Sequence, residues 1–304
     1  MDWRDRFDSV RMHVTPILDR IAATRGRCRT VVPLEGGMTN RNYRVQVGDV
    51  GEDVEIYVLR LAGTNTACLG IDRECEVACS RAAADLGLGP EVLAFLPEFG
   101  ALLRRYVPGA ILAPEAIRRP EVLRQLADAL RRYHDSPAGA GRFCAFKAIR
   151  SSYAQACARA VPFPETIHRA LELLDRIEAH LPAGDLCPCH NDLLAANIIE
   201  SPRGLQIIDW EYAGMGDRFF DLGNLAVNNA FEETEEQRLL EFYFGRVEEA
   251  QLRRLRIMRL ISDLRESLWG FLQAGLSQLD VDFQAYGRRH LERFLSNAAS
   301  TVLP

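Results

Sequence analysis

The chain has 304 residues, of which 48% are hydrophobic and 26% are charged, and these fractions are ordinary for a globular protein. A formal net charge of -5 argues against a general nucleic-acid binder, whose surface needs an excess of positive charge. No run approaches the roughly 20 apolar residues of a membrane-spanning helix, and the first residues lack the apolar core of a signal peptide. We therefore expect a cytoplasmic protein that is long enough for two lobes.

The eight cysteines raise the question of disulfides or a metal site. No two of them have the spacing C-x-x-C, and no Cys/His quartet is present, so the pattern does not favour zinc. We expect reduced thiols that are mostly buried.

The N-terminal third predicts a small antiparallel sheet that carries one helix. Residues 30–60 contain two runs typical of strands, "NYRVQV" and "VEIYVLRLA", separated by a turn. Residues 70–89 predict a helix that glycines terminate. Residues 91–109 predict a hairpin with its turn near Phe99-Gly100. We expect this part to end near Pro108-Gly109.

The remainder is mainly helical in pattern, with loops between the helices. We predict helices at residues 120–136, 164–181, 235–247 and 251–276. The exception is 186–213, where the β-like runs "NIIES" and "LQIIDWEY" flank the turn "PRG". A small β-rich lobe followed by a larger helical lobe offers a cleft between them as the ligand site.

A polar cluster stands just before that hairpin, in "CHNDLLAANII" at 189–199. His190, Asn191, Asp192 and Asn197 lie among apolar or small residues, and buried polar groups need partners. The cluster is therefore either a hydrogen-bonded turn or a catalytic loop. Phosphoryl transfer needs a group that orients the attacking hydroxyl and oxygen ligands for magnesium, and Asp209 ends the next apolar strand. Each residue alone suits a turn cap or a strand end, whereas the order H-N-D-x-x-x-x-N, hairpin, I-I-D favours the catalytic interpretation.

The segment "HNDLLAANIIESPRGLQIIDWEYAGMGDRFFDLGN" resembles the catalytic segment of the choline/ethanolamine kinases, within the aminoglycoside-phosphotransferase group of protein-kinase-like folds. The resemblance runs from about residue 31 to residue 296 and is most specific in 189–224 and 264–294. It implies an α+β, protein-kinase-like two-lobed fold. Residues 1–107 would be the small antiparallel-sheet N-lobe that binds nucleotide, and residues 108–304 the larger, mainly helical C-lobe.

The resemblance also implies roles for the polar residues. Asp192 would be the catalytic base or hydroxyl-orienting residue, and Asn197 and Asp209 would hold Mg²⁺. His190 and Asp221 would brace the catalytic loop by hydrogen bonds. ATP would be the phosphoryl donor.

The N-lobe would supply the nucleotide contacts. Arg60 stands where protein kinases place lysine, as in the bacterial choline-kinase-like branch, and a guanidinium can bind two phosphate oxygens at once. Helical periodicity leaves both Glu74 and Glu76 open as its partner, and the family pattern that starts at Arg73 favours Glu76. The other residues expected to bind nucleotide lie in a glycine turn and a hinge: Gly36, Gly37, Thr39, Asn40, Arg104, Arg105 and Tyr106.

A quaternary ammonium acceptor requires aromatic faces and carboxylates, because it has no N–H donors. By the resemblance, Trp269, Tyr286 and Glu211 would bind choline or a related amino alcohol beside Asp192. Trp269 lies about 100° from the main apolar stripe of its helix by helical geometry, so both core packing and a cleft wall remain open. Glu266 stands where some relatives carry an aromatic residue, so the completeness of the aromatic cage stays open, and with it the choice between choline, ethanolamine and another amine.

Two other functions remain open at this point. The first is a kinase for another hydroxylated acceptor, such as thiamine, an aminoglycoside or a sugar-like metabolite. The second is a nucleotide-binding pseudokinase, although such a protein typically lacks Asp192, Asn197 or Asp209, and all three are present. The sequence predicts no membrane insertion and does not indicate an oligomeric state.

Overall fold

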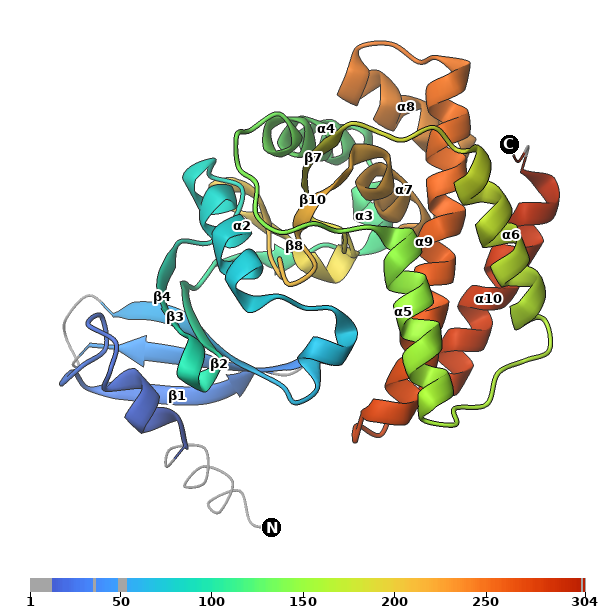
Figure 1. The fold of residues 1–304 in the computed structure, drawn as a ribbon. Helices are drawn as coiled ribbons and strands as arrows, with labels where there is room; N and C mark the ends of the chain where they lie inside the picture. The colour runs from blue at the N-terminus through green and yellow to red at the C-terminus, as the bar shows by residue number, and fades with distance from the viewer. Residues whose placement is uncertain (1–12, 35–36, 49–53, 302, 304) are drawn as a thin grey trace.

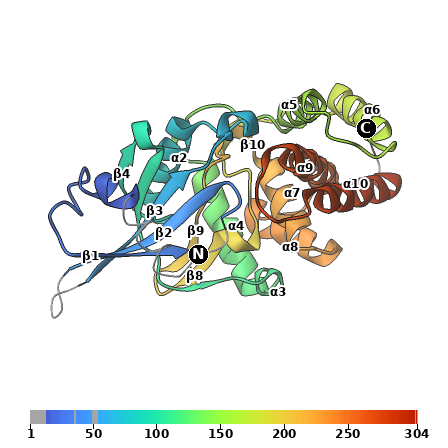
Figure 2. The same cartoon turned by 90° about the horizontal axis from the view of Figure 1, so that it is seen from below.

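A computed structural model of the chain describes residues 13–34, 37–48, 54–301 and 303. A sheet lies at one end of the molecule and a group of long helices at the other, as Figures 1 and 2 both show. The predicted α+β, protein-kinase-like class is thereby confirmed. Among the described helices, none combines the length and the apolar character that a membrane span needs.

The N-terminal sheet is antiparallel, with strand order β1-β2-β3-β5-β4. Its strand β2 alternates as the sequence predicts, because Tyr43, Val45 and Val47 are buried with a period of two. They pack against the apolar residues of the segment 14–21. The strands are β1 (Arg29–Leu34), β2 (Asn40–Val47), β3 (Glu55–Ala62), β4 (Val92–Leu96) and β5 (Ala101–Arg105).

Helix α2 (Arg73–Asp85) connects β3 to β4. It begins at Asp72, whose carboxylate accepts hydrogen bonds from the backbone N–H groups of Glu74 and Cys75, each at 3.0 Å. It ends two residues before Gly87, which has a φ of 71°. Helix α2 packs against β4 and carries Glu76 as a buried residue.

The larger part is built around α9 (Glu249–Leu276), whose middle is buried on all sides. It packs against α10, α7 and α5, and the long helices stand side by side in Figure 1. The other helices are α3 (Pro114–Ile117), α4 (Pro120–His134), α5 (Ala145–Ala158), α6 (Ile167–His180), α7 (Arg218–Asn228), α8 (Glu233–Phe244) and α10 (Phe283–Ser300).

The four helices expected from periodicity correspond to α4, α6, α8 and α9. Periodicity did not predict α3, α5, α7 and α10. The sequence of α5, AFKAIRSSYAQACA, buries only three residues, which leaves a weak apolar stripe, and α7 is only 11 residues long with Gly223 at its centre.

Short strands hold the predicted catalytic loop. The hairpin β8 (Ile198–Ser201) and β9 (Gly204–Ile207) forms as expected, with β6 (Ala110–Ile111) beside β8. Strands β7 (Leu186–Cys189) and β10 (Gly214–Asp217) pair with each other and were not predicted, because "LCPC" and "GMGD" are short and contain proline or glycine.

Candidate active site

The loop after β7 is held by one carboxylate. Asp221, from α7, accepts the backbone N–H of His190 at 2.7 Å and that of Asn191 at 2.6 Å. His134 Nε2, from α4, lies 3.0 Å from the same side chain. Asn191 has a φ of 66°, so this turn needs support to be maintained. Asp221 therefore ties the loop to two helices, as a bracing residue would.

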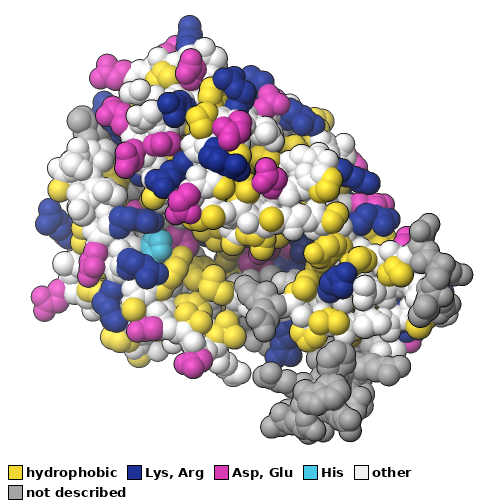
Figure 3. Space-filling view, turned by 180° about the vertical axis from the view of Figure 1, so that it is seen from behind, with side chains coloured by type: hydrophobic (Ala, Val, Ile, Leu, Met, Phe, Trp, Pro, Cys, Tyr) yellow, Lys and Arg dark blue, Asp and Glu magenta, His cyan; other side chains and the backbone are white. Residues whose placement is uncertain are grey.

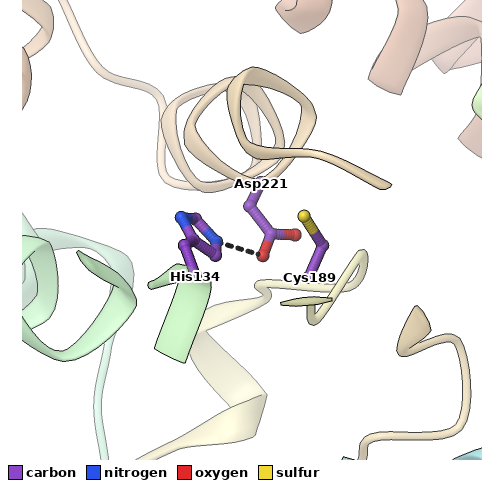
Figure 4. Close-up of side chains that lie close together, drawn as sticks. All are labelled: His134, Cys189 and Asp221. Atoms are coloured by element: carbon purple, nitrogen blue, oxygen red, sulfur yellow. Dashed lines mark hydrogen bonds and ion pairs between the residues drawn. The ribbon is translucent and has the colours of Figure 1, made fainter. Parts of the chain in front are cut away.

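His134, Cys189 and Asp221 bring three potential metal-ligand atoms together from three elements (Figure 4). Their polar atoms are already used, since His134 Nδ1 lies 2.7 Å from the hydroxyl of Tyr243 and Nε2 faces Asp221. Burial holds the pKa of the Cys189 thiol well above its ordinary value, so the thiolate that a metal requires is disfavoured. We interpret this cluster as a hydrogen-bonded brace.

His190 also shapes the loop from within. Its Nδ1 accepts the backbone N–H of Asp192 at 3.1 Å, and its Nε2 lies 3.0 Å from the carbonyl oxygen of Ile208. This pattern requires the neutral ring with its proton on Nε2, and burial lowers the pKa of His190 accordingly. His190 therefore connects Asp192 to Ile208, the residue between β9 and Asp209.

Two asparagines that sequence reasoning left without a role complete the support. The side chain of Asn191 donates to the carbonyl oxygen of Tyr212 at 3.0 Å. Asn224, from α7, accepts the backbone N–H of Leu193 and donates to Ser262 of α9 at 2.9 Å. In the sequence, the only signal was that both asparagines stand among apolar residues of the quoted segment. Their burial became evident in the structure, and their partners lie far along the chain.

The predicted magnesium ligands have free oxygens. Asn197 Nδ2 donates to the carbonyl oxygen of Asp192 at 2.9 Å, which leaves Asn197 Oδ1 available. Asp209 follows β9 with a φ of 65° and makes no hydrogen bond or ion pair with the described residues. Both line a cavity of about 490 Å³ together with Asp192, in the hollow between the two parts of the molecule (Figure 3). This set of amide and carboxylate oxygens fits Mg²⁺.

The burial of the two aspartates disfavours their charged forms and so raises their pKa values. Burial raises the pKa of Asp192 to about 7, against the opposing effect of Arg265. Burial and the neighbouring Glu211 raise the pKa of Asp209 to about 8. Negative charge is thus concentrated where a cation would stabilise it.

Across the cavity, Arg60 pairs with Glu76. Arg60 Nη1 lies 3.0 Å from Glu76 Oε2, and both side chains are buried, whereas Glu74 is exposed. Burial lowers the pKa of Arg60 to about 10, so its guanidinium remains charged at neutral pH. Arg73 donates to the same Glu76 oxygen at 2.7 Å. The structure thereby resolves the choice that periodicity left open.

Four buried or nearly buried arginines around the cavity retain donors without partners among the described residues. These atoms are Arg60 Nε and Nη2, Arg73 Nε, Arg104 Nε and Nη1, and Arg265 Nη2. Arg104 and Arg265 line the cavity, and Arg60 and Arg73 reach it through Asn40 Oδ1, at 3.3 and 2.8 Å. Buried guanidinium groups are costly without acceptors, so this arrangement suits a polyanion.

Glu211 connects the glycine turn, at Thr39 and Asn40, to the larger lobe. Its carboxylate accepts hydrogen bonds from Thr39 Oγ1 at 2.7 Å and Asn40 Nδ2 at 2.8 Å, and Arg73 lies at 3.1 Å. Glu211 lines the cavity, as expected of a substrate-side residue, but its oxygens are engaged by the N-lobe. A Cβ at Gly37 would stand 2.2 Å from the Asn40 carbonyl oxygen, so glycine is required there. Gly36 lies outside the described residues.

The residues of the predicted hinge differ in the backbone and side-chain groups that they offer to the cavity. The N–H groups of Arg105 and Tyr106 already donate to the carbonyl oxygens of Glu91 and Ile56, at 2.9 and 3.0 Å. The next residue, Val107, lines the cavity, and no described group accepts its N–H. Arg104 and Arg105 both line the cavity, Arg104 with a buried side chain and Arg105 with a half-exposed one that pairs with Glu91. Val107 was not among the expected residues, because a backbone donor leaves no mark in side-chain pattern.

The opposite wall is aromatic and acidic. Trp269 donates from Nε1 to the Tyr212 hydroxyl at 3.0 Å, and its ring lies 5.8 Å from that of Tyr286. The Tyr286 hydroxyl donates to Glu266 at 2.7 Å. Trp269 also packs on Phe283, so it is both a core residue and a wall of the cavity. Sequence reasoning found Trp269 and Tyr286 but missed Tyr212.

The profile of the phosphotransferase enzyme family matches residues 30–257, about three quarters of the chain. The chain belongs to that family. Within it, this phosphotransferase is similar to the choline/ethanolamine kinase family protein from Mesorhizobium loti, with 30% identity, a TM-score of 0.77, and coverage of 95% of this chain and 94% of that one. The choline kinase LicA from Streptococcus pneumoniae has 25% identity, a TM-score of 0.77, and coverage of 96% and 98%.

A curated relative gives the same result. "Probable choline kinase 1" of Arabidopsis thaliana is 25% identical over 299 residues, which cover 87% of this chain and 85% of the relative. The spectinomycin phosphotransferase APH(9)-Ia shares the fold, with a TM-score of 0.63 at 17% identity. These comparisons confirm the resemblance to the choline/ethanolamine kinases that the catalytic segment indicated. They also confirm that the chain is a phosphotransferase for an alcohol acceptor.

Proposed function

We propose that this phosphotransferase transfers the γ-phosphoryl group of ATP to the hydroxyl of choline or a related amino alcohol, with Mg²⁺. The observation that carries the proposal is that one cavity brings together two sets of polar groups without partners among the described residues: arginine N–H donors and carboxylate or amide oxygens. Buried arginines with donors that lack acceptors surround it, Arg104 and Arg265 as part of its lining, and Asn197 and Asp209 line it with free oxygens. Magnesium polyphosphate is the ligand class that satisfies both.

Each residue has a task in this reaction. Arg60, oriented by Glu76, binds phosphate oxygens, with Gly36, Gly37, Thr39 and Asn40 forming the loop over the nucleotide. The hinge at Arg104, Arg105 and Tyr106 contacts the base, and we add the Val107 N–H as its donor. Asn197 and Asp209 hold Mg²⁺, which would neutralise charge on the transferring phosphoryl group. Asp192 orients the acceptor hydroxyl and receives its proton, in a loop braced by His190 and Asp221.

The acceptor would bind against Trp269 and Tyr286, with Glu211 adding negative charge to the same cavity. Each cation–π contact contributes about 0.5–2 kcal/mol, depending on desolvation. The printed names of the similar proteins, choline kinase and choline/ethanolamine kinase, support this acceptor class. The aminoglycoside phosphotransferases match at 17% identity or less, which supports the shared fold rather than their acceptors.

The test is a screen of Mg-ATP consumption over choline, ethanolamine, thiamine and aminoglycosides. We expect turnover with choline or ethanolamine. Trp269→Ala should raise the KM for the acceptor by about 10-fold with little change in the KM for ATP, because it removes an aromatic face. Trp269→Phe, the matched control, keeps an aromatic face and should recover most of the affinity. Turnover with thiamine or an aminoglycoside alone would favour the other kinase, and no turnover with any acceptor would contradict the proposal.

A further inference from the structure

Arg265 lies in the middle of α9 and is nearly fully buried. Its Nη1 donates to Asp192 Oδ1 at 3.1 Å and also pairs with Glu266. Its Nη2 has no partner among the described residues, and the side chain lines the cavity. No role for Arg265 came from the sequence.

The guanidinium is fixed from two directions. It stacks on the ring of Tyr212 at 4.2 Å, and the Tyr212 hydroxyl is held by Trp269. On its other side Glu266 is held by the Tyr286 hydroxyl at 2.7 Å. A planar guanidinium pinned by a carboxylate and an aromatic face has little freedom to turn. Arg265 is therefore a rigid donor.

That rigidity bears on Asp192. Arg265 occupies Oδ1, while Oδ2 receives only a long contact of 3.4 Å from Asn197 Nδ2. Oδ2 is thus the carboxylate oxygen left for a substrate hydroxyl. The chain of contacts from Tyr286 through Glu266 and Arg265 ends at Asp192, so the acceptor wall and the reacting carboxylate share one support.

We propose that Arg265 is a positioning residue that aligns Asp192 for the acceptor hydroxyl and couples this alignment to the acceptor wall through Glu266. This inference rests on the proposed function, because kcat and KM are measured with the proposed acceptor. A merely structural ion pair would affect stability, whereas a positioning role affects turnover at constant nucleotide affinity. The coupling further implies that Glu266, which contacts neither Asp192 nor the nucleotide side in the described structure, influences kcat.

The experiment compares Arg265→Lys, Arg265→Gln and the double variant Arg265→Gln/Glu266→Gln. The double variant matters because Arg265→Gln alone leaves Glu266 buried without its cation and risks misfolding. Arg253→Gln is the control, since Arg253 is an exposed arginine of the same helix. For each variant, kcat and KM are measured with choline and Mg-ATP, together with Tm and the slow hydrolysis of ATP by water.

We expect the double variant to lose about 100-fold in kcat, because misplacement of a reacting group by about 1 Å has that effect. Its KM for ATP should stay within about twofold, and Arg253→Gln should match the wild type. Arg265→Lys should retain more turnover than Arg265→Gln, since an ammonium can keep the single bond to Asp192. A folded double variant with kcat within about threefold of the wild type would overturn the proposal.

The two hypotheses can fail separately. If the wild type phosphorylates no amino alcohol, the proposed acceptor is wrong, but ATP hydrolysis still reports on Asp192, which would then orient water. A loss of hydrolysis in the folded double variant supports the positioning role, and unchanged hydrolysis contradicts it.

Discussion

The two sides of the cavity differ in how their polar groups are satisfied. On the nucleotide side, Arg60, Arg73 and Arg104 are charged side chains that keep buried donors without acceptors. On the acceptor side, Trp269, Tyr286 and Glu266 already bond to neighbouring side chains. The first surface keeps several buried donors without acceptors, whereas the second keeps one among the described residues, Arg265 Nη2.

This difference explains why the donor is easier to infer than the acceptor. Unpaired guanidinium donors specify an anion, and nearby free oxygens specify a cation, so Mg-ATP follows from local chemistry. An aromatic wall whose polar atoms are occupied selects by shape and by cation–π attraction, which many amines satisfy. Acceptor selectivity therefore depends on small differences in packing.

Asp192 lies where the two sides meet, so its removal should have the largest effect. Asp192→Ala should lower kcat by about 10³-fold or more, because the hydroxyl loses its proton acceptor. Nucleotide affinity, measured by calorimetric titration, should largely persist. Asp175→Ala, an exposed aspartate on α6, is the control. Near-normal turnover of purified Asp192→Ala would remove Asp192 from the mechanism.

Arg60 tests the nucleotide side alone. Arg60→Ala should reduce kcat/KM for ATP by roughly 10- to 100-fold, since hydrogen bonds to a charged group contribute about 1.5–3 kcal/mol. Arg60→Lys should be intermediate, because it keeps the charge and loses the bidentate geometry. Arg41→Ala, on the neighbouring strand β2 and exposed, should be neutral. If the loss appeared in acceptor KM instead, the division of the cavity into two sides would be wrong.

Arg104 tests whether buried donors without partners lower the free energy of unfolding of the ligand-free protein. Arg104→Met should raise the free energy of unfolding of the free protein by about 1 kcal/mol, because it removes a buried guanidinium without partners. The same variant should bind Mg-ATP more weakly. Arg105→Met, next to it but half-exposed and paired with Glu91, should leave the free energy of unfolding nearly unchanged. Thermal unfolding with and without nucleotide measures both effects, and destabilisation of free Arg104→Met would contradict the account.

The smallest expected effect concerns Mg²⁺ and pH. The folded pKa of Asp209, about 8, lies above its ordinary 3.8, so its favourable contribution is complete below about pH 4 and is lost as pH rises through 8. Mg²⁺ requires the ionised carboxylate and must displace a proton at low pH. The increase in Tm on adding Mg²⁺ should therefore grow from pH 6 to pH 9. Asp209→Asn should abolish this growth, and an increase independent of pH would contradict Asp209 as a ligand.

Much of this site could be predicted because its signals are local. Asp192, Asn197 and Asp209 lie within 18 residues on one loop and hairpin, and the chain order alone brings them together. The choice of Glu76 over Glu74 needed the family pattern, because both flank the apolar face of α2. The structure confirms that choice of ion-pair partner at 3.0 Å.

The rest depends on contacts between distant segments. Arg265 reaches Asp192 across 73 residues, and Glu211 reaches Thr39 across 172. The periodicity of apolar residues along the sequence does not indicate such pairs. Helices α5 and α7 escaped prediction for a local reason, since α5 buries only three residues and α7 is 11 residues long with Gly223 at its centre.

The most direct test of the central claim is phosphorus NMR of the wild-type protein with Mg-ATP and choline. The account predicts a phosphomonoester signal that grows as the γ-phosphate signal falls, with ADP formed in equal amount. It also predicts that Asp192→Ala, which retains nucleotide binding, gives no such signal. Release of inorganic phosphate alone, with choline unmodified and ethanolamine equally inert, would contradict the claim that this cavity transfers a phosphoryl group to an amino alcohol.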